Sequence, residues 1–241
     1  MLLHHQEFVE YSERTILEDY LGMSRVHHRK PIVSDNFFGR FKKLEFDAAC
    51  NRPILIPSHV LPYLKNLEEL NVHSSDALQV IFNIDESEVK MNGTVFGLKK
   101  LTLENLSNLK YVWKENSTGI ISFHNLQEVV VNGCGNLITL FSSSLARNLK
   151  KLHKLRITEC GKLVAIVRKE DGIEHGKKIM FEFPFLYYLH LENMPLLSCF
   201  YPEKHHLDCP LLQTLILCYC PKLKPFASDF DDNERSYRGS N

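Results

Sequence analysis

The sequence predicts an α/β solenoid, a stack of short repeats in which parallel strands line one side. Two observations predict it. First, an aromatic residue or Leu followed by L-x-x-L-x-L recurs seven times along the 241 residues. Second, the apolar residues inside each copy lie two apart, the period of a strand with one buried face. Such short apolar units, repeated at intervals close to 20–29 residues, are typical of leucine-rich repeats.

The copies follow one another from residue 41 to residue 226. They read FKKLEFDAAC from Phe41, LKNLEELNVHSSDALQVIF from Leu64, FGLKKLTLENLSNLKYVW from Phe96, FHNLQEVVVNGCGNLITLF from Phe123, LKKLHKLRITECGKLVAIV from Leu149, FLYYLHLENMPLLSCF from Phe185 and LLQTLILCYCPKLKPF from Leu211. In each predicted strand, one apolar residue is the first to face inward. These residues are Leu44, Leu70, Leu101, Val129, Leu155, Leu189 and Leu215. One repeat cannot bury its apolar side alone, so we expect seven stacked units to share a core.

A second set of apolar residues completes that core from the returning arm of each repeat. It comprises Leu78, Leu109, Leu137, Leu163, Leu197 and Leu223. Cys134, Cys160 and Cys220 occupy the same repeat position as Leu106 and Met194, so we expect them to be packing residues. The aromatic residues at the end of the repeats, Phe82, Trp113, Phe141 and Phe200, are interpreted as core stacking rather than as a ligand cage. The stack is expected to form a horseshoe with the parallel sheet on its concave face and irregular loops or short helices on its convex face.

The residues between the inward-facing ones form the predicted concave binding face. They are Lys43, Glu45, Asp47, Glu69, Asn71, His73, Lys100, Thr102, Glu104, Glu128, Val130, Asn132, Lys154, Arg156, Thr158, Tyr188, His190, Glu192, Thr214, Ile216 and Cys218. Acidic members gather in the early repeats, a basic pair lies in the fifth, and aromatic and apolar members close the series. This mixed surface favours a protein partner over nucleic acid, which would require a continuous basic stripe.

Three segments interrupt or flank the repeats. Residues 1–36 lack the pattern and are predicted to be an N-terminal cap or remnant, residues 37–227 the repeat domain, and residues 228–241 a polar, disordered tail. Polar insertions are expected at 83–95 and 168–180, between one repeat and the next. In the fourth repeat, the segment SSSLARNLKKL from Ser142 has a candidate N-cap serine before the spaced residues Leu145, Leu149 and Leu152, which predicts a short helix on the convex side.

Composition and charge further restrict the class of protein and its compartment. The 29 basic and 29 acidic residues balance, so there is no overall field to attract nucleic acid or an anionic membrane. No apolar run is long enough to span a bilayer, and the first residues lack the apolar core of a secretory signal. The seven cysteines have no disulfide-like spacing, which favours a reducing compartment. The Asn-x-Ser/Thr sequons at Asn92, Asn105 and Asn116 are weak evidence for the opposite, a glycosylated protein outside the cytosol. We therefore expect a cytoplasmic protein.

The sequence does not predict a catalytic or metal site. Zinc-ligand residue types gather near the end of the chain, at Cys199, His205, His206, Cys209, Cys218 and Cys220, but without a paired Cys-x2-Cys knuckle. No cysteine stands in a nucleophile motif, and the carboxylates Asp85, Glu86 and Glu88 read as a solvated charge run. We predict no enzyme activity and no cofactor; a metal-dependent enzyme or zinc module built on the His/Cys end is the less favoured alternative.

The phrases LTLENLSNLKYVW, SFHNLQEVVVNGCGNLITLF and CPLLQTLILCYCPKLKPF resemble the leucine-rich-repeat region of plant intracellular nucleotide-binding (NB-ARC) disease resistance proteins. The turns Cys-Gly-Asn-Leu, Cys-Gly-Lys-Leu and Cys-Pro-Lys-Leu carry much of the likeness, which is strongest to the coiled-coil class of legumes. The resemblance implies pathogen recognition and restraint of a receptor.

In such receptors the repeats follow a nucleotide-binding switch, but the sequence contains no Gly-x4-Gly-Lys-Ser/Thr phosphate loop. The partners that the resemblance implies are a pathogen effector, a guarded host protein or the receptor's own nucleotide-binding domain. The alternative is a free-standing adaptor, such as a ubiquitin-ligase substrate receptor, which would need an F-box that residues 1–36 do not show.

Overall fold

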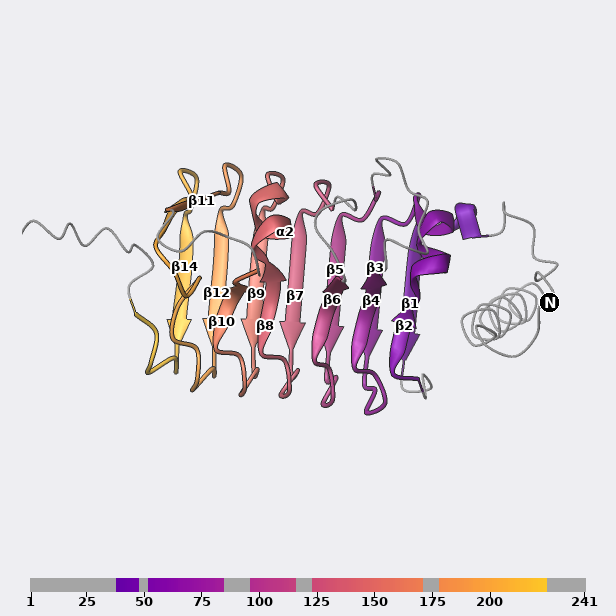
Figure 1. The fold of residues 1–241 in the computed structure, drawn as a ribbon, viewed down its shortest axis with the longest axis horizontal. Helices are drawn as coiled ribbons and strands as arrows, with labels where there is room; N and C mark the ends of the chain where they lie inside the picture. Colours follow the sequence, from indigo (N-terminus) through magenta and orange to yellow (C-terminus); the bar gives the residue numbers. More distant parts are fainter. Residues whose placement is uncertain (1–37, 48–51, 85–95, 116–122, 171–177, 225–241) are drawn as a thin grey trace, which may run out of the picture.

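In the computed structural model, the described residues are 38–47, 52–84, 96–115, 123–170 and 178–224. Residues 1–36 and 228–241, the predicted cap and tail, lie outside them, as do the three carboxylates of the predicted charge run. Within the described part the repeats stack side by side along one axis (Figure 1).

The main sheet has seven parallel strands, one from each predicted repeat, in the order β1-β3-β5-β7-β9-β12-β14. The strands are β1 (Lys43–Asp47), β3 (Glu69–His73), β5 (Lys100–Glu104), β7 (Glu128–Asn132), β9 (Lys154–Thr158), β12 (Tyr188–Glu192) and β14 (Thr214–Cys218). The predicted first apolar residues pair in one row across the sheet, from Leu44 opposite Leu70 to Leu189 opposite Leu215. The predicted solenoid with its parallel sheet is therefore confirmed.

The core lies on one side of this sheet and is filled as the repeat pattern predicts. Leu101 and Leu103 of β5 are completely buried, and Leu109 reaches the same core from the returning arm. Cys134 and Cys160 are also completely buried, and their Sγ atoms donate to the carbonyls of Asn132 and Thr158 at 3.7 and 3.3 Å. These cysteines are therefore packing residues, as predicted.

The returning arms are more regular than predicted, because many of them form short strands. Three small parallel sheets result, made of β2 (Ile54–Ile56) with β4 (Val80–Ile84) and β6 (Tyr111–Glu115), of β8 (Thr139–Ser142) with β10 (Ala165–Arg168), and of β11 (Ile179–Glu182) with β13 (His205–Asp208). The insertions predicted at 83–95 and 168–180 are therefore shorter than expected, because strands occupy the described residues at their ends. Ile84 belongs to β4 and Ile179 to β11, whereas 85–95 and 171–177 lie outside the described residues.

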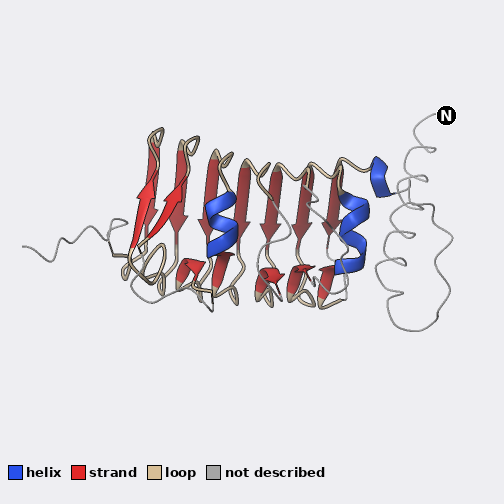
Figure 2. Cartoon of the chain, turned by 45° about the horizontal axis from the view of Figure 1, so that its top comes forward, coloured by secondary structure: helices blue, strands red, loops and turns tan. Residues whose placement is uncertain are grey.

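Short helices supply the remaining described elements: η1 (Phe38–Arg40), η2 (Ser58–Leu64) and α2 (Ser143–Asn148). The helix expected after Ser142 is confirmed as α2, and the Ser142 Oγ accepts a hydrogen bond from the Leu145 N–H at 3.3 Å. The helix ends at Asn148, earlier than the apolar spacing up to Leu152 suggested. Figure 2 shows α2, η2 and the small sheets on the same side of the seven-stranded sheet.

An aromatic column stacks along the inside of the returning arms. Phe82 and Trp113 are stacked with ring centroids 6.1 Å apart, and Trp113 lies 5.3 Å from Phe141. Phe123 contacts both Phe82 and Trp113 at 5.3 and 5.8 Å. All four rings are buried, which supports core stacking and not a ligand cage.

The turns that follow the main strands form a repeating hydrogen-bond ladder. One residue after each of six strands has a positive φ of 53–66°, and this set comprises Ser74, Asn105, Gly133, Glu159, Asn193 and Tyr219. The N–H of Asn105 donates to the Asn132 carbonyl of the next strand at 2.9 Å, and the N–H of Glu159 donates to Glu192 at 3.1 Å. The ladder places these side chains in one row along an edge of the solenoid.

The last strand differs from its predicted environment. Leu215 and Leu217 of β14 were expected to face the core, yet their side chains are 47% and 44% exposed. They do occupy the inward-facing rows of the sheet, but no described element stacks beyond β14. A strand with a neighbour on only one side leaves its apolar residues partly in solvent.

Candidate functional site

The side of the main sheet turned away from the core is here called the free face. In Figure 2 no described element covers it. All 21 residues of the predicted binding face lie in the seven strands, where they alternate with the core residues, and they form three rows. The first row starts at Lys43, the middle row at Glu45 and the last row at Asp47.

The first row carries lysines that are mostly balanced by carboxylates. The Lys154 Nζ lies 2.9 Å from the Glu128 Oε1 and 5.6 Å from the ring centroid of Tyr188, so one ammonium joins three strands. Lys100 lies 3.5 Å from Glu69 in the same way. These contacts leave few unpaired cations on the row, which is unfavourable for a polyanionic ligand.

The middle row contains an exposed cation near the centre of the sheet. Arg156 of β9 is exposed and lies in register between Val130 of β7 and His190 of β12. It makes no ion pair within the part of the chain that the structure describes. Because its guanidinium has five donors and lies beside apolar surface, it suits the centre of a protein contact.

Polar contacts also join the three rows to one another. His190 of the middle row links two neighbours on its own strand: its Nδ1 lies 3.3 Å from the Tyr188 Oη of the first row, and its Nε2 lies 2.9 Å from the Glu192 Oε2 of the last row. The Thr158 Oγ1 donates to the Asn132 Oδ1 at 2.8 Å. These contacts fix side-chain directions on the free face.

Two of the predicted face residues are much less accessible than strand alternation suggests. His190 is 8% exposed and Thr158 is 3% exposed. Tyr188 and Glu192 flank His190 in the contacts above, and Asn132 lies against Thr158. Alternation gives the face on which a side chain lies, whereas its exposure depends on neighbours in adjacent strands.

At the first repeat, Lys43 and Glu45 form a pair on the free face at 3.2 Å. The hydrogen bond and charge of Lys43 lower the pKa of the Glu45 carboxyl, and His73 and Asn71 act in the same direction. In the next two strands, His73 lies 3.2 Å from the Glu104 Oε2. The free face at this end is therefore polar and internally paired.

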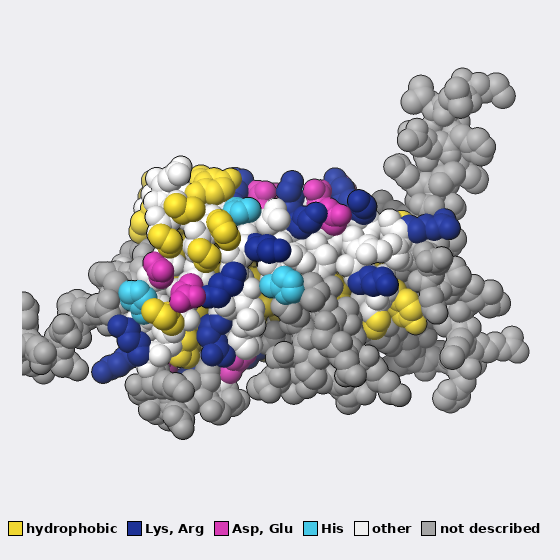
Figure 3. Space-filling view, turned by 90° about the horizontal axis from the view of Figure 1, so that it is seen from above, with side chains coloured by type: hydrophobic (Ala, Val, Ile, Leu, Met, Phe, Trp, Pro, Cys, Tyr) yellow, Lys and Arg dark blue, Asp and Glu magenta, His cyan; other side chains and the backbone are white. Residues whose placement is uncertain are grey.

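The sequence did not reveal an apolar ridge beside the free face in the fifth and sixth repeats. Phe185 and Tyr187 are 49% and 45% exposed, and both rings contact the His153 ring, at centroid distances of 5.9 and 6.4 Å. Hydrophobic side chains gather at this end of the molecule in Figure 3. In the sequence, Phe185 was interpreted only as the first residue of a repeat. The aromatic residues from Phe183 to Tyr188 were the pattern from which the ridge could have been predicted.

The histidines and cysteines near the end of the chain have structural partners. His205 is buried, with ring centroids of Phe181, Phe200 and Tyr201 at 5.8–6.1 Å, and its Nδ1 lies 2.8 Å from the Glu203 carbonyl oxygen. Among the described residues, no group of three His, Cys, Asp or Glu is arranged to hold a metal ion.

The partly buried thiols here are poor nucleophiles. Burial raises the pKa of Cys209 to about 11, with a further contribution from the charge of Asp208. Burial is also the largest influence on Cys220, whose pKa is raised. At neutral pH the reactive thiolate form is therefore disfavoured at both residues.

Among the helices of the described segments, none has the length and hydrophobicity of a membrane span.

The stacked strands, the buried leucines and the recurrent turns define a leucine-rich-repeat domain. Residues 10–161 match the family of plant disease resistance protein RPS2-like leucine-rich repeats. The chain belongs to this family. Domains of the family are typically non-catalytic, and membership in it suggests a protein-interaction role in defence. Strands β12 and β14 lie beyond the matched segment but continue the same sheet in register. No solved structure was found to match the chain.

Proposed function

We propose that this domain is the recognition part of a plant intracellular immune receptor and that it binds a protein through the free face of its main sheet. In this proposal the receptor also contains a nucleotide-binding (NB-ARC) switch and belongs to the coiled-coil class found in legumes. The repeats act in the cytoplasm. Their partner is a pathogen effector, a guarded host protein or the receptor's own switch domain.

The observation that carries the proposal is the uncovered sheet face with Arg156 at its centre. A seven-stranded sheet offers a broad, rigid surface, because every strand is held on both sides or, at the ends, on one. Arg156 stands between Val130 and His190, and the cation–aromatic pair of Lys154 and Tyr188 lies in the adjoining row. Arginine and aromatic residues at the centre of a patch are the usual anchors of protein interfaces.

The charge arrangement supports a protein ligand over a polyanion. Lysines of the first row are held by Glu128 and Glu69, and the opposite row contains Asp47, Glu104 and Glu192. Such a face has both signs of charge and so favours a partner with complementary charges of both signs.

Restraint of the receptor follows from the same surface in this proposal. If the receptor's own switch domain occupies the free face in the resting state, a pathogen-derived ligand competes for it. Charge reversal at the centre of the face would then release the switch and trigger defence signalling without a pathogen.

The experiment compares two charge reversals in the full-length receptor, expressed in leaf tissue. Arg156→Glu alters the centre of the free face, whereas Lys110→Glu alters an exposed cation on the returning-arm side. We expect Arg156→Glu to change partner binding and defence output by about tenfold or more, the effect of a hot-spot residue. Lys110→Glu should leave both unchanged. Equal behaviour of both variants and the unmodified receptor would refute binding through the free face.

A further inference from the structure

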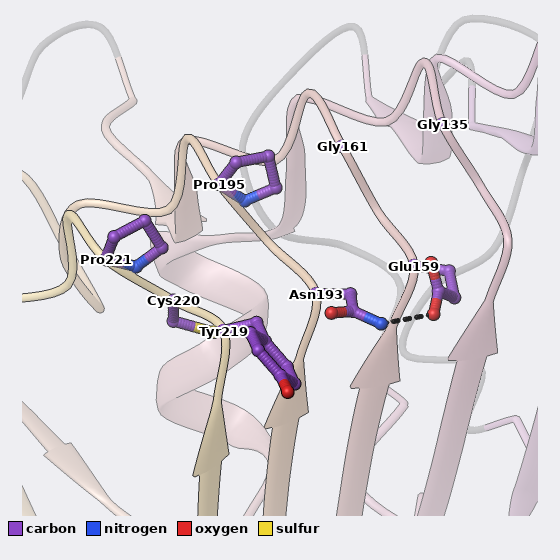
Figure 4. A pocket seen from close by; sticks show the side chains of 8 residues that line it. All are labelled: Gly135, Glu159, Gly161, Asn193, Pro195, Tyr219, Cys220 and Pro221. Carbon is purple, nitrogen blue, oxygen red and sulfur yellow. Dashed lines mark hydrogen bonds between the residues drawn. The ribbon is translucent and has the colours of Figure 1, made fainter.

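A second surface lies along the turns that follow the main strands, apart from the free face. It is a groove of about 900 Å3 that runs from the turn at Gly135 to the turn at Pro221. Its wall is made by Glu159, Asn193 and Tyr219, the residues that follow β9, β12 and β14 (Figure 4). Each of these belongs to the positive-φ row of the turn ladder.

The groove presents hydrogen-bond acceptors without a matching cation. The Asn193 Nδ2 donates to the Glu159 Oε1 at 2.5 Å, which fixes both side chains relative to each other. The second carboxylate oxygen of Glu159 and the amide oxygen of Asn193 remain available to accept. Glu159 forms no ion pair with any of the described residues.

An exposed aromatic ring adjoins these acceptors. Tyr219 is 78% exposed, and in Figure 4 its ring extends from the last turn toward Asn193. The turn that bears it is anchored, because the Met194 N–H donates to the Tyr219 carbonyl at 3.2 Å. A tyrosine with a φ of 53° and so much exposed surface contributes little to stability, since both features are unfavourable for an L-residue with a large ring.

The floor of the groove is open to an approaching backbone. A Cβ atom added at Gly135 or Gly161 would meet nothing within 4 Å. The groove also crosses several successive turns, so its long direction suits a chain in an extended conformation.

From this geometry we propose that the groove binds the side chain of an arginine within an extended peptide segment of a protein partner. The guanidinium donates to Glu159 and Asn193 while its planar face lies against the ring of Tyr219. Arginine fits better than lysine because it has several donors in one plane and stacks on aromatic rings. The inference deepens the proposed function, on which it rests for the partner being a protein.

The test measures binding of a defined peptide to the isotope-labelled chain by nuclear magnetic resonance. The probe is acetyl-Gly-Gly-Arg-Gly-Gly-amide, and its match contains citrulline, which has the shape of arginine but no charge. We expect the arginine peptide to shift the amide signals of Glu159, Asn193 and Tyr219 and the citrulline peptide to bind about tenfold more weakly. Equal affinity for both peptides, or shifts confined to other regions, would overturn the proposal.

Substitutions assign the contribution of each side chain. Glu159→Gln removes the charge but keeps an acceptor for Asn193, and it should weaken the arginine peptide about tenfold. Tyr219→Ala should weaken it about two- to fivefold, the loss expected of one exposed cation–aromatic contact. Glu182→Gln is the matched control, since that carboxylate pairs with Lys150 elsewhere on the chain, and it should leave the affinity unchanged. An unchanged affinity in Glu159→Gln would contradict the assignment.

Failure of this inference can be told apart from failure of the proposed function. If both proposals hold, Arg156→Glu on the free face should leave the affinity for the arginine peptide unchanged while it changes binding of the receptor's protein partner by about tenfold or more. A changed affinity for the peptide in Arg156→Glu, expected as a gain because a carboxylate replaces a cation beside a cationic ligand, would show that the peptide occupies the free face and not the groove, which would overturn the inference alone.

Discussion

At the scale of single residues, the turn ladder requires a left-handed backbone after each of the six main-sheet strands from β3 to β14. Gly133 meets this requirement in the fourth repeat with a φ of 66°, and other repeats use Asn105, Asn193 or larger residues. Glycine adopts this conformation without strain, whereas residues with a Cβ pay a penalty of roughly 1 kcal/mol. The residues of the turn ladder that have a Cβ are therefore less favourable for stability than a glycine would be at the same position.

Replacing Gly133 by alanine tests this account. An added Cβ would lie 2.6 Å from the Asn105 Oδ1, and although that side chain can turn away, the positive φ remains. We expect Gly133→Ala to lower the free energy of unfolding by about 1–2 kcal/mol in urea denaturation. Gly135→Ala, whose Cβ would meet nothing within 4 Å, is the control and should change it by less than about 0.5 kcal/mol. Equal losses in the two variants would contradict the argument.

Burial at equivalent positions provides a second residue-level prediction. Leu101 and Leu215 occupy the same row of the main sheet, but Leu101 is completely buried and Leu215 is 47% exposed. Leu101→Ala should destabilise the domain by about 3 kcal/mol, as expected for a fully buried leucine, and Leu215→Ala by about 1 kcal/mol. Thermal or chemical unfolding of both variants measures the difference. A loss for Leu215→Ala as large as for Leu101→Ala would mean that another element covers β14.

At the scale of elements, the sequence was more informative about the main strands than about the returning arms. Leu101 and Leu103 alternate with polar residues, so a strand with one buried face could be predicted. In the returning arm, Val80, Ile81 and Phe82 are all buried, and such an uninterrupted apolar run does not distinguish a strand from an irregular core segment. Exposure was equally unpredictable at His190, because its cover comes from side chains whose directions depend on the fold.

The helix α2 shows how a local element is attached to the next repeat. Glu170 accepts hydrogen bonds from the Ser143 Oγ at 2.6 Å, the Ser144 Oγ at 2.6 Å and the Ser144 N–H at 3.0 Å. Burial alone would raise the pKa of this carboxyl, but the bonds from Ser143 and Ser144 outweigh burial and the pKa is lowered below 4.5. The ionised carboxylate therefore stabilises the folded chain.

This contribution has a defined pH dependence. Since the pKa of Glu170 is lower in the folded chain, its stabilisation is fully present above about pH 4.5 and is lost as the pH falls through the folded-state value. We expect Glu170→Gln to reduce the free energy of unfolding by about 1 kcal/mol at pH 7, a value discounted for partial exposure. The difference from the unmodified chain should shrink as the pH is lowered below 4.5. A difference that stays constant with pH would show that the charge of Glu170 is not involved.

At the scale of the whole molecule, stacking makes two long surfaces from small repeats. The free face collects one set of side chains from seven strands, and the turn edge collects another from the residues after them. Neither surface exists within one repeat, so both depend on the register that aligns Arg156 with Val130 and His190. The fold could be predicted because the spacing of apolar residues repeats along the sequence. The ridge at Phe185 and the groove at Tyr219 could not, because they form only when side chains of successive repeats lie side by side.

The central claim is that the free face contacts the protein partner, and hydroxyl-radical footprinting of the receptor with and without that partner tests it most directly. The account predicts that oxidation of Tyr188 and Ile216 on the free face falls several-fold in the complex. Oxidation of Tyr111 and Ile138, which are 46% and 52% exposed on the returning arms, should stay the same. Protection of Tyr111 and Ile138 with unchanged oxidation of Tyr188 and Ile216 would contradict the account and place the partner on the opposite side of the solenoid.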